Sequence, residues 1–132
     1  MRNDLYDMQA EVAQVNFDKG WRGDGAPDVS FGESIALLHS EVSEALEAYR
    51  DHGLADATGD SGKFVRFGGD TLSTSPVHFV PPKPEGVGSE LADVLIRLLD
   101  TADRFGIDLT AEYERKVAFN ATRPYRHGGK RL

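Results

Sequence analysis

The chain is 132 residues long, has a formal net charge of −7 and contains no cysteine. This length suits one domain with a sizeable core, residues 1–132, and the lack of cysteine excludes disulfides, thiol nucleophiles and cysteine-held metals. The excess of 22 acidic over 15 basic residues argues against a nucleic-acid polymer or an anionic membrane as the main partner. No signal peptide and no membrane-spanning apolar run is recognisable, so we expect a cytoplasmic protein.

The apolar residues recur with a helical period in the first half of the chain. Leu5, Met8, Val12 and Val15 have the spacing of one helix face and predict a helix over residues 4–18. Three glycines and a proline make residues 19–30 a loop. A second helix is expected from about Phe31 to His52. The capping-box pair Ser30 and Glu33 precedes it and Gly53 ends it. The apolar stripe of this helix is Ile35, Leu38, Val42, Ala45, Leu46 and Tyr49.

The second half predicts two more helices, so the expected fold class is all-α. One begins near Ser89, a plausible cap, and extends to about Phe105 before a glycine; the other covers residues 109–121. Residues 54–88 between the second and third helices are rich in Gly, Ser, Asp and Pro, with two short alternating apolar runs. They predict an insert or lid, either with a small β-hairpin or without regular structure.

Two acidic pairs occupy matching positions on the second and third helices. Glu41 and Glu44, like Glu90 and Asp93, are three residues apart and border the apolar stripe of their own helix at the same two offsets. If the two helices pack side by side, four carboxylates converge at the edge of the interface. Glu47 lies further round its helix and is a weaker candidate.

Like charges at this spacing repel one another, and two explanations of the pattern remain open. The carboxylates are either solvated surface charges, with Arg97 four residues after Asp93 as an ion-pair partner, or ligands of a cation. Carboxylate oxygens are the ligands that Mg²⁺ and Mn²⁺ favour. The geometry therefore predicts a divalent-metal site and goes no further.

The motifs "EVSE" and "ELAD" resemble the EXXE…EXXD signature of the MazG-like all-α nucleoside triphosphate pyrophosphohydrolases. The flanks agree as well: "LLHSEVSEALEAYR" surrounds the first motif, and "KPEGVGSELADVLIRLLDTADRFGIDL" contains the second. The C-terminal "ERKVAFNATRPYRHGGKRL" also resembles the end of such proteins. The long separation of the two motifs, caused by residues 54–88, departs from the compact members and weakens any transfer of substrate specificity.

This resemblance implies a four-helix MazG-like bundle that is completed by oligomerisation, as a homodimer or homotetramer. It also implies Mg²⁺-dependent hydrolysis of (d)NTPs to the nucleoside monophosphate and pyrophosphate. Glu41, Glu44, Glu90 and Asp93 are then the catalytic metal ligands. The residues that the resemblance assigns to the substrate are Lys116, Asn120, Arg123 and, with less support, Lys19 and Trp21.

Two alternatives to this function follow from the same residues. One is a non-catalytic helical module that binds a metal or a basic partner through its acidic ridges. The other is a pyrophosphohydrolase that acts on a different pyrophosphate, such as phosphoribosyl-ATP. The basic and polar residues Lys116, Asn120 and Arg123 favour an enzyme, because a ridge that binds only cations has no need of phosphate contacts.

Overall fold

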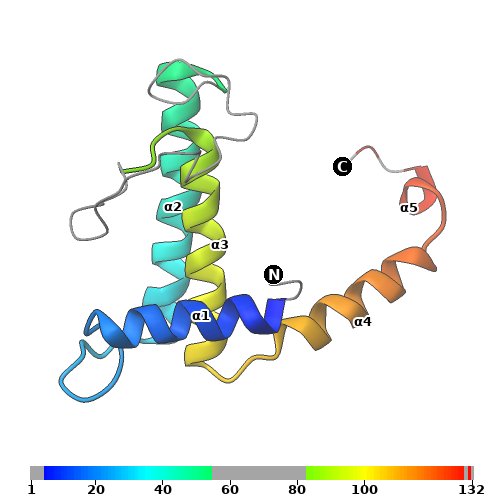
Figure 1. The fold of residues 1–132 in the computed structure, drawn as a ribbon. Helices are drawn as coiled ribbons and strands as arrows, with labels where there is room; N and C mark the ends of the chain where they lie inside the picture. The colour runs from blue at the N-terminus through cyan, green and yellow to red at the C-terminus, as the bar shows by residue number, and fades with distance from the viewer. Residues whose placement is uncertain (1–4, 55–82, 130, 132) are drawn as a thin grey trace, which may run out of the picture. The chain divides into compact units, whose positions relative to one another are not determined.

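The residues that the computed structural model describes, 5–54, 83–129 and 131, form helices joined by loops and contain no strand (Figure 1). The helices are α1 (Leu5–Asp18), α2 (Phe31–His52), α3 (Val87–Arg104), α4 (Leu109–Ala121) and the short α5 (Arg126–Gly129). The all-α fold class is thus confirmed for this part of the chain. The predicted β-hairpin falls within 55–82, outside the described residues.

The ends of α2 follow the predicted capping chemistry. The Ser30 backbone N–H donates to the Glu33 carboxylate at 2.8 Å, and the Glu33 N–H donates to the Ser30 hydroxyl at 3.2 Å. This capping box lowers the pKa of Glu33, because the backbone hydrogen bond from Ser30 stabilises the charged carboxylate. At the other end Gly53 takes a left-handed φ of 63°, and its N–H bonds the Tyr49 carbonyl at 2.8 Å. Both predicted ends of α2 are therefore confirmed.

The start of α3 differs from the prediction. The helix begins at Val87, and the first helical N–H bond runs from Glu90 to the carbonyl of Gly86 at 3.1 Å. Gly86 has a φ of 99°, which turns the chain into the helix two residues before the predicted start. Ser89 is therefore inside the helix, and its hydroxyl donates to the Pro84 carbonyl at 3.2 Å instead of capping.

The turn from α3 to α4 is fixed by hydrogen bonds at both helix ends. Ile107 N–H donates to Ala102 O at 2.8 Å, and Gly106 N–H donates to Asp103 O at 3.2 Å, which together form a Schellman motif. The Asp108 side chain then accepts from the Ala111 N–H at 3.0 Å as the N-cap of α4. The bounds of α4 are those predicted, whereas α5 was not predicted.

The chain divides into two compact units. The first unit comprises Met1–Ser34 and Ile96–Leu132, and the second comprises Ile35–Leu95. In the first unit α1 contacts α4, and Gln9 Nε2 donates to the Ile107 carbonyl at 3.3 Å. Leu99 is 1% exposed there, so the end of α3 supplies the best-covered apolar side chain among the described residues.

The second unit contains most of α2, from Ile35 onward, and α3 up to Leu95. Ala45 of the predicted apolar stripe is buried, as expected. Val42, Leu46 and Tyr49 of the same stripe are about half exposed, at 52%, 49% and 53%. In the described part of the chain, much of the apolar side of α2 is thus exposed.

None of the helices in the described part of the chain is both long and apolar enough to cross a membrane.

Candidate metal centre

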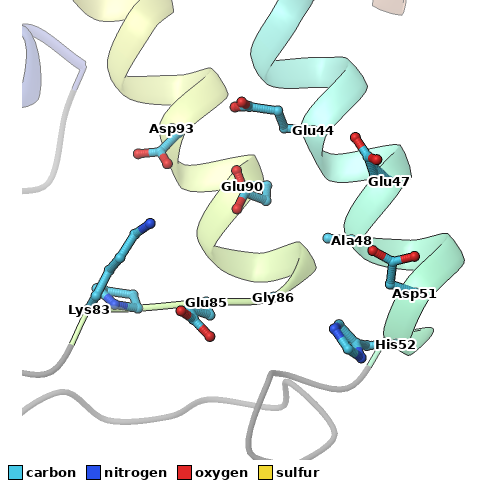
Figure 2. Close-up of a pocket in the computed structure, with 11 residues that line it drawn as sticks. Glu44, Glu47, Ala48, Asp51, His52, Lys83, Glu85, Gly86, Glu90 and Asp93 are labelled. Atoms are coloured by element: carbon cyan, nitrogen blue, oxygen red, sulfur yellow. The ribbon is translucent and has the colours of Figure 1, made fainter.

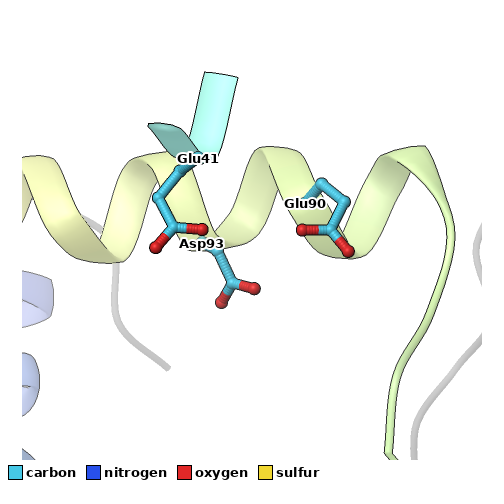
Figure 3. Close-up of side chains that lie close together, drawn as sticks. All are labelled: Glu41, Glu90 and Asp93. Carbon is cyan, nitrogen blue, oxygen red and sulfur yellow. The ribbon is translucent and has the colours of Figure 1, made fainter. Parts of the chain in front are cut away.

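Three carboxylates from α2 and α3 meet within the second unit. One carboxylate oxygen each from Glu41, Glu90 and Asp93 lie within 4.8 Å of one another (Figure 3). Glu90 and Asp93 are nearly one turn apart on α3 and therefore share a face, while Glu41 reaches them from α2. Glu41 is only 9% exposed, which is unusual for a glutamate. These three side chains can hold a metal ion.

Glu44 completes the predicted group of four. Its pKa is raised above the ordinary 4.5, first because its carboxyl forms a hydrogen bond with Glu41 and then because of the negative charge of Glu41. Slight desolvation and the charges of Glu90 and Asp93 add to the same effect. The convergence of all four carboxylates, which the matched spacing on the two helices predicts, is therefore present in the structure.

The raised pKa of Glu44 shows that the cluster disfavours a further negative charge, because Glu41, Glu90 and Asp93 lie close by. A divalent cation neutralises the same negative charge without protonating a ligand. The donor set contains oxygen only, which fits Mg²⁺ or Mn²⁺ better than the softer metals that prefer nitrogen or sulfur.

A pocket of about 410 Å³ adjoins these carboxylates within the second unit (Figure 2). Glu44, Glu47 and Asp51 follow one another along its α2 side, and Glu90 and Asp93 line its α3 side. The rest of the lining is Ala48, His52, Lys83, Pro84, Glu85 and Gly86.

The sequence analysis missed most of the residues at the far end of this pocket. It treated Glu47 as a weaker candidate and did not consider Asp51, Lys83 or Glu85. A signal was present in α2, because positions 44, 47 and 51 have the spacing of one helix face. No comparable signal precedes α3, since the placement of Lys83 and Glu85 depends on the turn at Gly86.

The predicted substrate residues belong to the first unit, so the structure describes them separately from the carboxylates. Lys116 and Asn120 lie about one turn apart on α4, both exposed. Arg123 follows the helix end, where its N–H donates to the Asn120 carbonyl at 3.2 Å. Lys19 and Trp21 lie in the loop after α1, and Trp21 is 61% exposed. All five side chains are accessible to a ligand.

The loop that carries Trp21 is held in place by its own backbone. Trp21 N–H donates to the Asn16 carbonyl at 2.9 Å. Gly23 has a φ of 90°, and a Cβ built on it would lie 2.7 Å from the ring of Phe17. A side chain at this position would therefore displace the aromatic ring.

A charged network, which the sequence analysis did not predict, ties this loop to α3. Arg22 spans two carboxylates, with Nη1 at 3.1 Å from Asp100 Oδ1 and Nη2 at 3.0 Å from Asp103 Oδ2. Asp100 also accepts from Asn16 Nδ2 at 2.8 Å and lies 3.6 Å from Arg104 Nη2. Asp100 and Asp103 have the same three-residue spacing as the metal-cluster pairs, but arginine side chains neutralise them.

Comparison with known proteins adds no relative. A scan of protein-family models, a search of curated proteins and a search of solved structures each gave no match to this chain.

Proposed function

We propose that this protein is a Mg²⁺-dependent pyrophosphohydrolase that cleaves (d)NTPs to the nucleoside monophosphate and pyrophosphate. The observation that carries this proposal is the convergence of Glu41, Glu44, Glu90 and Asp93 on two adjacent helices. The resemblance of "EVSE", "ELAD" and the C-terminal segment to MazG-like enzymes supports the same reaction. It is a resemblance in motifs and their order.

Glu41, Glu90 and Asp93 would hold the ion, with Glu44 beside them. When bound, Mg²⁺ would supply positive charge that stabilises the triphosphate oxygens and would favour deprotonation of the attacking water. Water oxygen attacks the α-phosphorus, the α–β anhydride bond breaks, and pyrophosphate leaves with the bonding electrons. We assign to a Glu44 carboxylate oxygen the proton that the attacking water loses. Glu44 suits this role because its carboxyl lies beside the three that would hold the ion.

By the same resemblance, Lys116, Asn120 and Arg123 would bind the phosphates and the sugar. Arg123 can bind a phosphate through two parallel N–H donors, and Lys116 can bind one as a point charge. Asn120 can both donate to and accept from a sugar hydroxyl. Lys19 and Trp21 remain the weaker candidates for contacts with phosphate and base.

We also propose that the protein acts as a homodimer or homotetramer. Val42, Leu46 and Tyr49 have the i, i+4, i+7 spacing of one helix side, and each is about half exposed. A second copy that covers this side of α2 would bury apolar area that one chain leaves in water.

The direct test is pyrophosphate release from a panel of dNTPs and NTPs, measured with Mg²⁺ and again with EDTA. We expect release that EDTA abolishes, together with the nucleoside monophosphate in equal amount. Phosphoribosyl-ATP belongs in the same panel, because activity on it alone would identify the other pyrophosphohydrolase. If the folded protein binds Mg²⁺ but hydrolyses nothing, it is a binding module.

A further inference from the structure

The pocket beside the carboxylate cluster contains more polar side chains than a metal ion requires. Its volume of about 410 Å³ falls in the range of roughly 300–1,000 Å³ that is usual for small-molecule sites. Three of the six carboxyl groups that line it belong to the metal cluster. The other ionisable side chains in the pocket are Glu47, Asp51, Glu85, Lys83 and His52.

The residues that line the pocket explain why side chains do not fill it. The facing sides of two packed helices are normally apolar and interdigitate. At this end of α2 the pocket side carries Glu47, Ala48 and Asp51, and the chain opposite enters α3 at Gly86, which has no side chain to fill the space. Short side chains set among polar ones leave a cavity where an apolar seam would be filled. The hollow is therefore a solvent-open depression between the end of α2 and the start of α3, with exposed charged side chains along it.

The pocket offers more hydrogen-bond acceptors than donors. The carboxylates of Glu47, Asp51 and Glu85 only accept hydrogen bonds, while Lys83 and His52 can donate. A group that complements this lining presents N–H donors beside a ring acceptor. Cytosine, adenine and guanine carry an exocyclic amino group, whereas uracil and thymine have carbonyl oxygens at C2 and C4 and only the ring N3–H as a donor. A carbonyl that faces a carboxylate leaves two acceptors opposed, with neither satisfied.

Resting on the proposed function, we infer that this pocket holds the base of the nucleotide and selects bases with an exocyclic amino group over uracil and thymine. The triphosphate occupies the end of the pocket at Glu44, Glu90 and Asp93, where the ion binds. The base then lies toward the last turn of α2, within reach of Glu47, Asp51 and Glu85. The specificity comes from carboxylates that do not bind the metal.

The closest pair of substrates for a test is dCTP and dUTP, which share the sugar and the pyrimidine ring and differ in an amino or a carbonyl group at C4, with the matching acceptor or N–H donor at N3. We expect kcat/KM for dCTP to exceed that for dUTP by about tenfold or more. Glu47→Gln, Asp51→Asn and Glu85→Gln are made singly, because an amide can donate as well as accept and so tolerates either base. At least one of them should bring the ratio close to one. Glu114→Gln on α4 removes the same charge from an exposed position and should leave the ratio unchanged.

Several outcomes would overturn the base assignment alone. Mg²⁺-dependent release at equal rates from dCTP and dUTP, or faster from dUTP, contradicts it and leaves the hydrolase intact. A preference for dCTP that none of the three variants alters also contradicts it, since the selection then arises elsewhere.

Measurements of nucleotide binding can test the base assignment even if the protein hydrolyses no nucleotide. If no nucleotide is hydrolysed, calorimetry with Mg²⁺ and each of the two nucleotides measures the same preference. Tighter binding of dCTP that is lost in one of the variants supports the pocket assignment without the enzyme. Equal binding, or none, overturns it.

Discussion

Glu41 combines two properties that rarely occur in one glutamate side chain. It is nearly buried, and it lies against three other carboxyl groups. A divalent cation held by Glu41, Glu90 and Asp93 would offset the repulsion among these carboxylates.

Replacing single ligands should separate metal binding from folding. We expect Glu41→Gln or Asp93→Asn to reduce Mg²⁺-dependent pyrophosphate release by more than the roughly 10–100-fold typical of replacing a residue that only hydrogen-bonds to a metal ligand. Because each change removes charge from a repulsive cluster, the circular dichroism spectrum and Tm in EDTA should match or exceed those of the unchanged protein. Glu114→Gln is the control. Full activity in both cluster variants would show that the site is misassigned.

The raised pKa of Glu44 predicts how Mg²⁺ binding depends on pH. A proton on Glu44 competes with the ion, so affinity should rise with pH as the pH passes through the raised pKa, above the ordinary 4.5. In EDTA, the stability of the folded protein should change with pH in the opposite direction. The folded state holds this proton more tightly than the unfolded state, so the stabilisation is complete below 4.5 and is lost as the pH rises through the folded pKa.

Calorimetric titration with Mg²⁺ across pH checks the predicted rise in affinity. Thermal unfolding in EDTA across pH checks the predicted loss of stability. The difference between the unchanged protein and Glu44→Gln isolates this group from the other carboxyls. Parallel pH profiles for the two proteins would contradict the prediction.

At the level of secondary-structure elements, the loop after α1 depends on one aspartate. The Asp100 carboxylate accepts hydrogen bonds from Asn16 and Arg22 and forms an ion pair with Arg104. A single carboxylate thus connects the end of α1, the loop and α3. Its side chain is 16% exposed, so water compensates little for a lost partner.

Asp100→Asn should therefore destabilise the protein, by about 2 kcal/mol, because an amide replaces a carboxylate that accepts charged hydrogen bonds. Asp103→Asn is the matched control. Asp103 bonds to Arg22 alone among these partners and its side chain is 33% exposed, so we expect less than about 1 kcal/mol. Urea unfolding of the two variants measures the difference. Equal losses would show that the network does not depend on Asp100.

Local signals in the sequence predict the helices well and the irregular segments poorly. Ser30, Glu33 and Gly53 define the ends of α2 because capping depends on neighbouring residues. The start of α3 was misplaced because Ser89 is a good cap in isolation, whereas the positive φ of Gly86 starts the helix earlier. Spacing also predicts the meeting of Glu41 with Glu90 and Asp93. It does not predict Arg22 with Asp100, because a loop residue has no period to reveal its partner.

On the scale of the whole chain, the described residues cover few of their large apolar side chains. Leu99 is almost fully buried, whereas half or more of the surface of Val42, Tyr49 and Leu91 is exposed. The helical period predicts which side of α2 is apolar, but not what covers it. That depends on contacts outside one helix, and in our proposal outside one chain.

Self-association should therefore be measurable and sensitive to α2. We expect light scattering after gel filtration to give two or four times the 14.5 kDa mass of one chain. Leu46→Glu should shift the protein toward the single-chain mass, because a charge cannot be buried there without a partner. Leu54→Glu, the same change at a 69% exposed leucine beyond the end of α2, should not. A single-chain mass for the unchanged protein would contradict the proposed oligomer.

Trp21 is the only tryptophan in the sequence, and it lies half open to water in a loop that hydrogen bonds fix to Asn16 and Arg104. Intrinsic fluorescence excited at the indole band therefore reports on this one loop, without a label and without background from a second site. Its emission should be red-shifted and readily quenched by acrylamide in the free protein. A nucleotide that stacks on the indole would shift and protect that emission, so a simple titration can locate ligand binding in the first unit even where hydrolysis is too slow to follow.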